Sequence, residues 1–215
     1  MKNNCFSILL LLLTLLPCSL NAQAGFSPIK DAGSFRQKVA SASRTTQTIE
    51  SSFVQEKIMD VLSEKITSRG KFYFRKENDL RWEYTSPVKY LIIIHNGNIL
   101  IRDESKESHF DARSNKLFSE INAIIVGSVK GTLFEDKTRF SSAFFENVSR
   151  YLVKMKPISS NLKATLCEIR LYIDKKDMTV SEIEMQEISG DMTRIVFQSK
   201  KINTPLPNDI FSSKK

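Results

Sequence analysis

Apolar and polar residues alternate most regularly between residues 70 and 97. Side chains on a strand point alternately to opposite faces, so alternate positions share a face. One face takes the apolar members of the run, which are Phe72, Phe74, Leu80, Trp82 and Tyr84. The other face takes Lys71, Tyr73, Arg75, Arg81 and Glu83. The pattern predicts adjacent antiparallel strands with one aromatic face and one charged face.

Asn96-Gly97 follows the apolar run Leu91–Ile94 and predicts a two-residue type I′ hairpin turn, because both residues tolerate positive φ. The same reasoning predicts the other strands. They span residues 49–59, 61–76, 80–84, 89–95, 99–103, 139–145, 149–155, 167–173, 178–187 and 194–201. His109 lies in a further predicted strand, Asn161–Lys163 lies in a predicted turn, and Gly70 marks a predicted bulge or bend.

Two segments have a helical period instead. In residues 29–45, Phe35, Val39 and Ala42 fall on one side of a helix. In residues 114–134, apolar residues recur at three- and four-residue spacing, and Gly127 and Gly131 loosen or end this second helix. Its apolar members are Leu117, Phe118, Ile121, Ile124, Ile125 and Val129.

The strand pattern predicts one antiparallel meander of about ten strands, and a twisted sheet of that size must curl or split. Wrapping the sheet around the helices would bury both apolar surfaces at once. We therefore predict a mainly β (α+β) fold, in which a strongly curved antiparallel sheet forms an incomplete β-barrel and helices cover its open side.

Residues 1–24 have the features of a cleaved signal peptide. Lys2 supplies the positive charge, Ile8–Leu16 the apolar segment, and Ala22-Gln23-Ala24 the small-x-small cleavage pattern. The apolar segment is too short for a stable membrane anchor. We expect a single domain over residues 25–215, a length of about 190 residues that can bury a substantial core.

Composition excludes some functions. The net charge is +8, but basic and acidic residues are interleaved and no helix carries a basic stripe, so nucleic acid is not an expected partner. A diffuse positive surface suits anionic lipid headgroups and equally suits an ordinary basic protein. Cys5 and Cys18 lie in the leader, which leaves Cys167, expected to be a buried, inert thiol.

The residues required for catalysis are not recognisable in the sequence. The two histidines, His95 and His109, have no partner at metal-site or triad spacing. The chain has no Gly-rich phosphate loop and no Gly-x-Ser-x-Gly motif. We predict that the protein is not an enzyme, that it has no catalytic residue and no metal, and that an apolar sheet face holds something apolar.

Several segments occur in an order that resembles a known family. They are the leader, the first helix, Phe53-Val54-Gln55, Gly70–Phe74, Leu80–Tyr84, Ser86-Pro87, Asn96-Gly97, Gly190–Thr193 and Asn208–Phe211. In this order they are similar to the LolA-type outer-membrane lipoprotein carrier proteins over nearly the whole mature chain. The resemblance implies a curved β-barrel, no cofactor, and an apolar cavity between sheet and helices that takes the acyl chains of lipoproteins.

The resemblance implies a role for particular residues and partners. The expected acyl-chain cavity is lined by Phe53, Phe72, Phe74, Leu80, Trp82, Tyr84, Ile92 and Ile94. The expected lid helix presents Leu117, Ile121, Ile124, Ile125 and Val129. The expected partners are acylated lipoproteins, an inner-membrane lipoprotein-releasing ABC transporter, and an outer-membrane receptor or the membrane surface. We expect a monomer in the periplasm of a Gram-negative bacterium.

Other interpretations stay open. Well-studied relatives have an Arg-Pro pair that latches the lid where this chain has Lys76-Glu77, so either Arg75 or Lys76 is the latch candidate. An apolar strand face is also compatible with an ordinary closed core. A protein of the same fold could bind another acylated molecule or a glycolipid, and a non-enzymatic sensor or interaction domain is the alternative of a different class.

Overall fold

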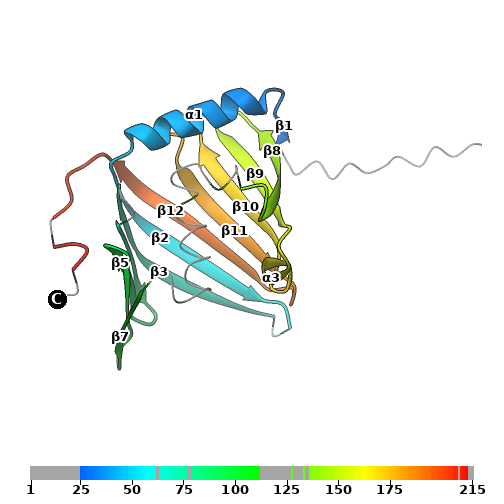
Figure 1. Cartoon of the computed structure of the whole chain (residues 1–215). Coiled ribbons are helices and arrows are strands. Elements are labelled where there is room, and N and C mark those ends of the chain that lie inside the picture. The colour runs from blue at the N-terminus through cyan, green and yellow to red at the C-terminus, as the bar shows by residue number, and fades with distance from the viewer. Residues whose placement is uncertain are drawn as a thin grey trace, which may run out of the picture.

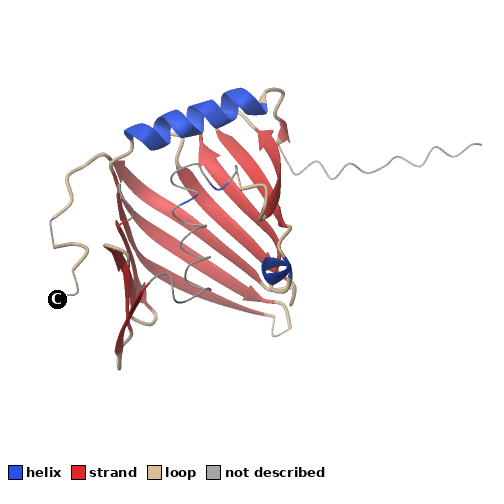
Figure 2. Ribbon diagram, in the orientation of Figure 1, coloured by secondary structure: helices blue, strands red, loops and turns tan. Residues whose placement is uncertain are grey.

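A computed structural model describes residues 25–61, 63–76, 79–111, 127, 133, 136–207 and 209–212. In this part of the chain, one 12-stranded antiparallel sheet forms a single curved layer, and helix α1 (Ala32–Thr45) lies along one end of it (Figures 1 and 2). The predicted signal peptide, residues 1–24, lies outside the described residues.

The first part of the sheet is a series of hairpins. Its strands are β2 (Thr48–Met59), β3 (Glu64–Arg75), β4 (Asp79–Ser86), β5 (Tyr90–His95), β6 (Asn98–Arg102) and β7 (Glu107–Asp111). Asn96 and Gly97 have φ of 49° and 77°, so the predicted two-residue turn between β5 and β6 is confirmed. His109 lies in β7, as predicted.

The second part forms the other half of the same sheet. Its strands are β8 (Phe140–Glu146), β9 (Arg150–Pro157), β10 (Leu166–Asp174), β11 (Val180–Glu187) and β12 (Met192–Ile202), and the short β1 (Ser27–Pro28) pairs with β8. The strand order is β1-β8-β9-β10-β11-β12-β2-β3-β4-β5-β6-β7. The prediction of one continuous meander is therefore wrong, because β8 does not pair with β7 and β12 pairs with β2 instead.

The sheet has two unjoined edges. Among the described residues, β1 and β7 do not pair with each other, so the curved sheet does not close into a full barrel. The predicted fold class, a curved antiparallel sheet forming an incomplete barrel, is confirmed. The predicted second helix, over residues 114–134, lies outside the described residues except for Gly127 and Leu133.

Helix α1 defines the inner face of the sheet. Its N-terminus is capped by Asp31, whose carboxylate accepts from the Ser34 backbone N–H at 3.0 Å. Phe35 and Val39, one helical turn apart, are buried in the main core. The Phe35 ring lies 4.8 Å from the Tyr151 ring of β9, so α1 packs on the face that we call the inner face.

Two local predictions are wrong. Asn161–Lys163 lie in a short helix, α3 (Ser160–Lys163), and not in a simple turn. Cys167 is exposed and not buried. The pairing of β10 with β11 shifts between Leu166 and Glu168, and Cys167 lies at this irregularity, outside the regular alternation that the prediction assumed.

Gly70 of β3 lies between strands β2 and β4. It is paired with Phe53 on β2 and Tyr84 on β4, and the predicted bulge is confirmed by a register shift next to it. A Cβ at this position would lie 2.1 Å from the Glu83 carbonyl oxygen and 2.4 Å from Cζ of Phe53. The missing side chain therefore leaves room for the Phe53 ring on the inner face.

We predict that Gly70→Ala lowers the free energy of unfolding by about 1–3 kcal/mol or more, since both the backbone oxygen and the ring would have to move. Chemical denaturation measures this change. Lys71→Ala, at the next and exposed position of β3, is the matched control and should change stability little. Equal stability of Gly70→Ala and the control would contradict the packing described here.

Asp136 caps the turn that leads into β8. Its carboxylate accepts from the Thr138 hydroxyl at 2.6 Å, from the Arg139 backbone N–H at 3.0 Å, and from Arg139 Nε. The Thr138 hydroxyl and Arg139 hold the pKa of Asp136 at about 2, below its ordinary 3.8. The folded structure therefore favours the charged form of Asp136.

Because the folded-state pKa is lowered, Asp136 stabilises the protein above about pH 4 and loses this effect as the pH falls towards about 2. We predict that Asp136→Asn costs about 1 kcal/mol at pH 6, a value reduced for screening by solvent, and that the difference from wild type shrinks towards pH 2. Denaturation at both pH values measures it. A difference that stays constant with pH would contradict this role.

Candidate functional site

The residues predicted to line an acyl-chain cavity share the inner face. Phe53, Phe72, Phe74, Leu80, Trp82 and Ile94 are buried in the main core, and Tyr84 and Ile92 are partly buried against it. The register explains this, since Phe72 lies opposite Trp82, which in turn lies opposite Ile92. The structure therefore brings the predicted lining residues together on one surface.

Trp82 is the centre of an aromatic cluster on this face. Its ring lies 4.7 Å from Phe53, 5.5 Å from Phe72 and 5.9 Å from Phe197, measured between centroids. Phe197 comes from β12, and sequence analysis missed it. The alternation of Ile195 and Phe197 indicated an apolar face, but nothing in the sequence indicated that β12 is the neighbour of β2.

The inner face becomes polar with distance from α1. Along β2 it presents Ile49 and Phe53, then Gln55, and finally Lys57. Lys57 Nζ lies 3.0 Å from Glu187 of β11 and 3.4 Å from Asp191, which precedes β12. The hydrogen bond that Lys57 donates to Glu187, more than the nearby charge of Asp191, raises the pKa of Lys57. The end of the inner face opposite α1 therefore carries hydrogen-bonding and charged groups.

Polar atoms also meet beside the aromatic cluster. Tyr84 Oη donates to Gln55 Oε1 at 2.8 Å, across the position of Gly70. Burial raises the pKa of Tyr84, and the indole N–H of Trp82 and the Gln55 amide oppose part of that shift. Even so, Trp82 Nε1 is buried and has no partner in hydrogen-bonding geometry within the described part of the chain.

The latch candidates have different surroundings. Arg75 donates from Nε and Nη2 to Asp79 Oδ2, and its guanidinium lies 4.6 Å from the centre of the Phe211 ring. Lys76 Nζ donates at 2.8 Å to the Arg44 carbonyl in the last turn of α1. The predicted lid residues Leu117, Ile121, Ile124, Ile125 and Val129 lie outside the described residues, so the latch stays a prediction.

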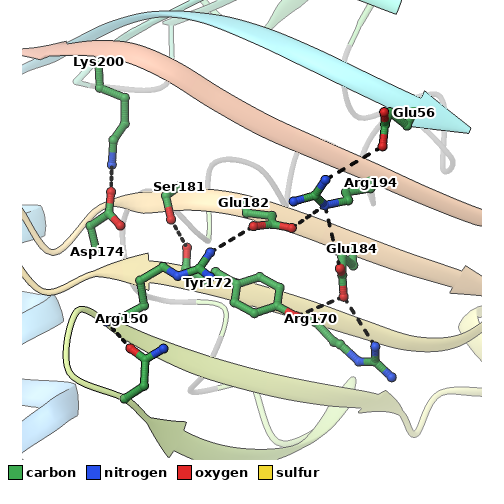
Figure 3. A network of polar contacts seen from close by, with 11 residues as sticks. Glu56, Arg150, Arg170, Tyr172, Asp174, Ser181, Glu182, Glu184, Arg194 and Lys200 are labelled. Atoms are coloured by element: carbon green, nitrogen blue, oxygen red, sulfur yellow. Dashed lines mark hydrogen bonds and ion pairs between the residues drawn. The ribbon is translucent and has the colours of Figure 1, made fainter. Parts of the chain in front are cut away.

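On the outer face, β9–β12 carry a network of ion pairs that the sequence did not reveal (Figure 3). Glu182 of β11 is nearly buried and bonds to both Arg150 and Arg194. Tyr172 donates to Glu184 at 3.1 Å, and burial beside this carboxylate raises the pKa of Tyr172 to about 12. Polar partners therefore satisfy the charged groups on this part of the outer face, where the Phe26 ring also lies 5.9 Å from the Tyr172 ring.

The C-terminal tail covers another part of the outer face. Phe211 is buried there and stacks on the ring of His95, and Arg81 Nη1 donates to the Ile210 carbonyl at 3.2 Å. This second, smaller core consists of Tyr73, Leu91, Ile93, Leu100, Leu206, Ile210 and Phe211. The face predicted to be charged carries an apolar cluster here, and the unbroken apolar run Leu91–Ile94 was the signal that both faces of β5 are covered.

No group of three or more His, Cys, Asp or Glu side chains in the described ranges is placed to hold a metal ion. Likewise, no helix in the described part of the chain has both the length and the apolar character needed to cross a membrane.

Comparisons with solved structures agree with the architecture. An uncharacterized conserved protein from Thermus thermophilus is 8% identical, with 86% of this chain and 95% of that chain covered and a TM-score of 0.53. The MucA/MucB complex from Pseudomonas aeruginosa contains a chain that is 10% identical, with 84% of this chain covered and a TM-score of 0.51. The match spans 60% of that chain, and at these identities both neighbours support the fold alone.

Comparisons of sequence go further. A protein from Methylococcus capsulatus named "Outer-membrane lipoprotein carrier protein" is 22% identical over 167 residues, which cover 78% of this chain and 77% of that protein. The family model described as "Outer membrane lipoprotein carrier protein LolA" matches residues 44–214. Since that match spans most of the sequence, the chain belongs to the LolA family of outer-membrane lipoprotein carrier proteins.

Proposed function

We propose that this protein is a periplasmic carrier that binds the acyl chains of lipoproteins and transfers them from the inner to the outer membrane. The observation that carries the proposal is the inner face itself. It is a continuous surface of aromatic and aliphatic side chains, centred on Trp82, in a chain that belongs to a carrier family.

The proposed binding surface consists of the predicted cavity residues together with Phe197. The segment with Leu117, Ile121, Ile124, Ile125 and Val129 is the proposed lid, and Arg75 or Lys76 its proposed latch. Burying one methylene contributes about 0.8 kcal/mol, so a chain of about fifteen carbons represents on the order of 12 kcal/mol. A lid that packs on the empty surface would compete with the cargo and lower the net affinity enough for release.

The proposed cycle needs a donor and an acceptor. An inner-membrane lipoprotein-releasing ABC transporter supplies the acylated lipoprotein, and an outer-membrane receptor or the membrane surface receives it. No covalent bond is made or broken, so the proposal needs no catalytic residue and no cofactor.

Native mass spectrometry of protein purified from the periplasm of a Gram-negative host tests the proposal. We expect triacylated lipopeptide or lipoprotein to copurify with the wild type. Free phospholipid or glycolipid as the only bound species would contradict the lipoprotein assignment and favour another acylated cargo. A protein that never carries lipid would contradict acyl binding as a whole.

Neighbouring residues of β12 provide a matched pair of variants. Phe197 lies on the inner face and Val196 on the outer face, and both are partly buried. We expect Phe197→Ser to weaken binding of a fluorescent acyl probe by about tenfold or more, through lost apolar contact. Val196→Ser should leave the affinity unchanged, and equal effects of the two substitutions would contradict binding at the inner face.

A further inference from the structure

The indole N–H of Trp82 is an unusual feature of the inner face. Trp82 is 3% exposed, and its Nε1 is buried without a hydrogen-bond partner among the described residues. Burying a polar N–H without a partner costs free energy, and native proteins pair the great majority of such groups. A buried donor that the described fold leaves unpaired is therefore a candidate contact for a ligand.

A second donor lies close by. Gln55 Oε1 accepts the hydrogen bond from Tyr84 Oη, which holds the side-chain amide in one orientation. The amide nitrogen of Gln55 stays available, since within the described ranges this side chain makes only the bond to Tyr84. Both donors lie beside Tyr84, because its hydroxyl bonds to Gln55 and its ring centroid lies 6.4 Å from that of Trp82.

The position of these donors along the sheet matters. On β4 the inner face presents Leu80, then Trp82, then Tyr84 with increasing distance from α1. On β2, Gln55 separates the apolar Phe53 from the charged Lys57. The two donors thus lie at the boundary between the apolar and the polar parts of the inner face.

We propose that Trp82 Nε1 and Gln55 Nε2 form a subsite for the ester or amide carbonyl oxygen at the head of an acyl chain. The inference rests on the proposed function and adds the orientation in which the acyl chain lies on the inner face. A carbonyl oxygen accepts hydrogen bonds, Trp82 Nε1 is a buried donor without a partner among the described residues, and Gln55 Nε2 is a second donor beside it. The hydrocarbon tail then extends towards α1, over Phe72 and Phe74, and the polar head of the cargo lies towards Lys57.

Trp82 is the only tryptophan, so the indole N–H gives one cross-peak in a ¹H–¹⁵N spectrum. The test titrates full-length mature protein with two probes: S-(dioctanoyloxypropyl)cysteine, which has ester carbonyls, and its dioctyl ether analogue, which has none. We expect the ester to move the indole proton downfield, as a new hydrogen bond does, and the ether to bind without that shift. Identical indole shifts for the two probes would overturn the subsite.

Affinities of a variant add an independent test. Trp82→Phe keeps a six-membered aromatic ring and removes the five-membered ring that carries the N–H donor. We expect the affinity for the ester to fall about fivefold more than the affinity for the ether, the effect of one neutral hydrogen bond. Tyr172→Phe, which removes a hydrogen-bonding hydroxyl from the outer face, is the control and should change neither affinity.

The outcomes separate the two proposals. Equal weakening of both probes by Trp82→Phe would assign Trp82 to packing alone and overturn the subsite, while acyl binding would stand. Failure of both probes to bind the wild type would instead overturn the proposed function. The spectrum of the wild type needs no variant, so it decides the question even where Trp82→Phe does not fold.

Discussion

The pairing of β12 with β2 is the interaction on which the inner face depends. It joins two sets of strands that the chain builds separately, β2–β7 and β8–β12 together with β1, into one 12-stranded sheet. The pairing places Phe197 opposite Phe53 and in contact with the Phe72 and Trp82 rings. Without it, the aromatic cluster would be divided between two narrower sheets, each with an additional exposed edge.

The two faces of the sheet are covered in different ways. The outer face is satisfied locally, by ion pairs on β9–β12 and by the C-terminal tail over β5 and β6. Among the described residues, α1 covers one end of the inner face through Phe35 and Val39, and Leu133 and Leu162 pack in the same core. A large apolar inner face opposite an outer face whose charges and smaller apolar cluster are paired within the protein suits a carrier of an apolar ligand, because solubility and cargo binding are then separate properties of the sheet.

Sequence analysis predicted the local features well. Alternation placed Phe72, Phe74, Leu80 and Trp82 on one face, and Asn96-Gly97 identified a hairpin turn, because both signals depend on neighbouring residues alone. It did not predict that β12 lies beside β2, since alternation assigns a residue to a face and not to a neighbouring strand. The tail was missed for a similar reason: Phe211 is buried against β5 and β6 by a contact between distant parts of the sequence. Cys167 was misplaced because an irregularity in β10 interrupts the alternation.

The central claim is that acyl chains bind against the inner face of the sheet. Ile92 and Ile94 lie on this face of β5, whereas Leu91 and Ile93 lie on the outer face of the same strand. The most direct measurement is methyl NMR of the protein with a triacylated lipopeptide that carries a nitroxide spin label within one acyl chain. The account predicts strong broadening of the Ile92 and Ile94 methyl signals and little effect on Leu91 and Ile93. Equal broadening on both faces, or broadening confined to the outer face, would contradict it.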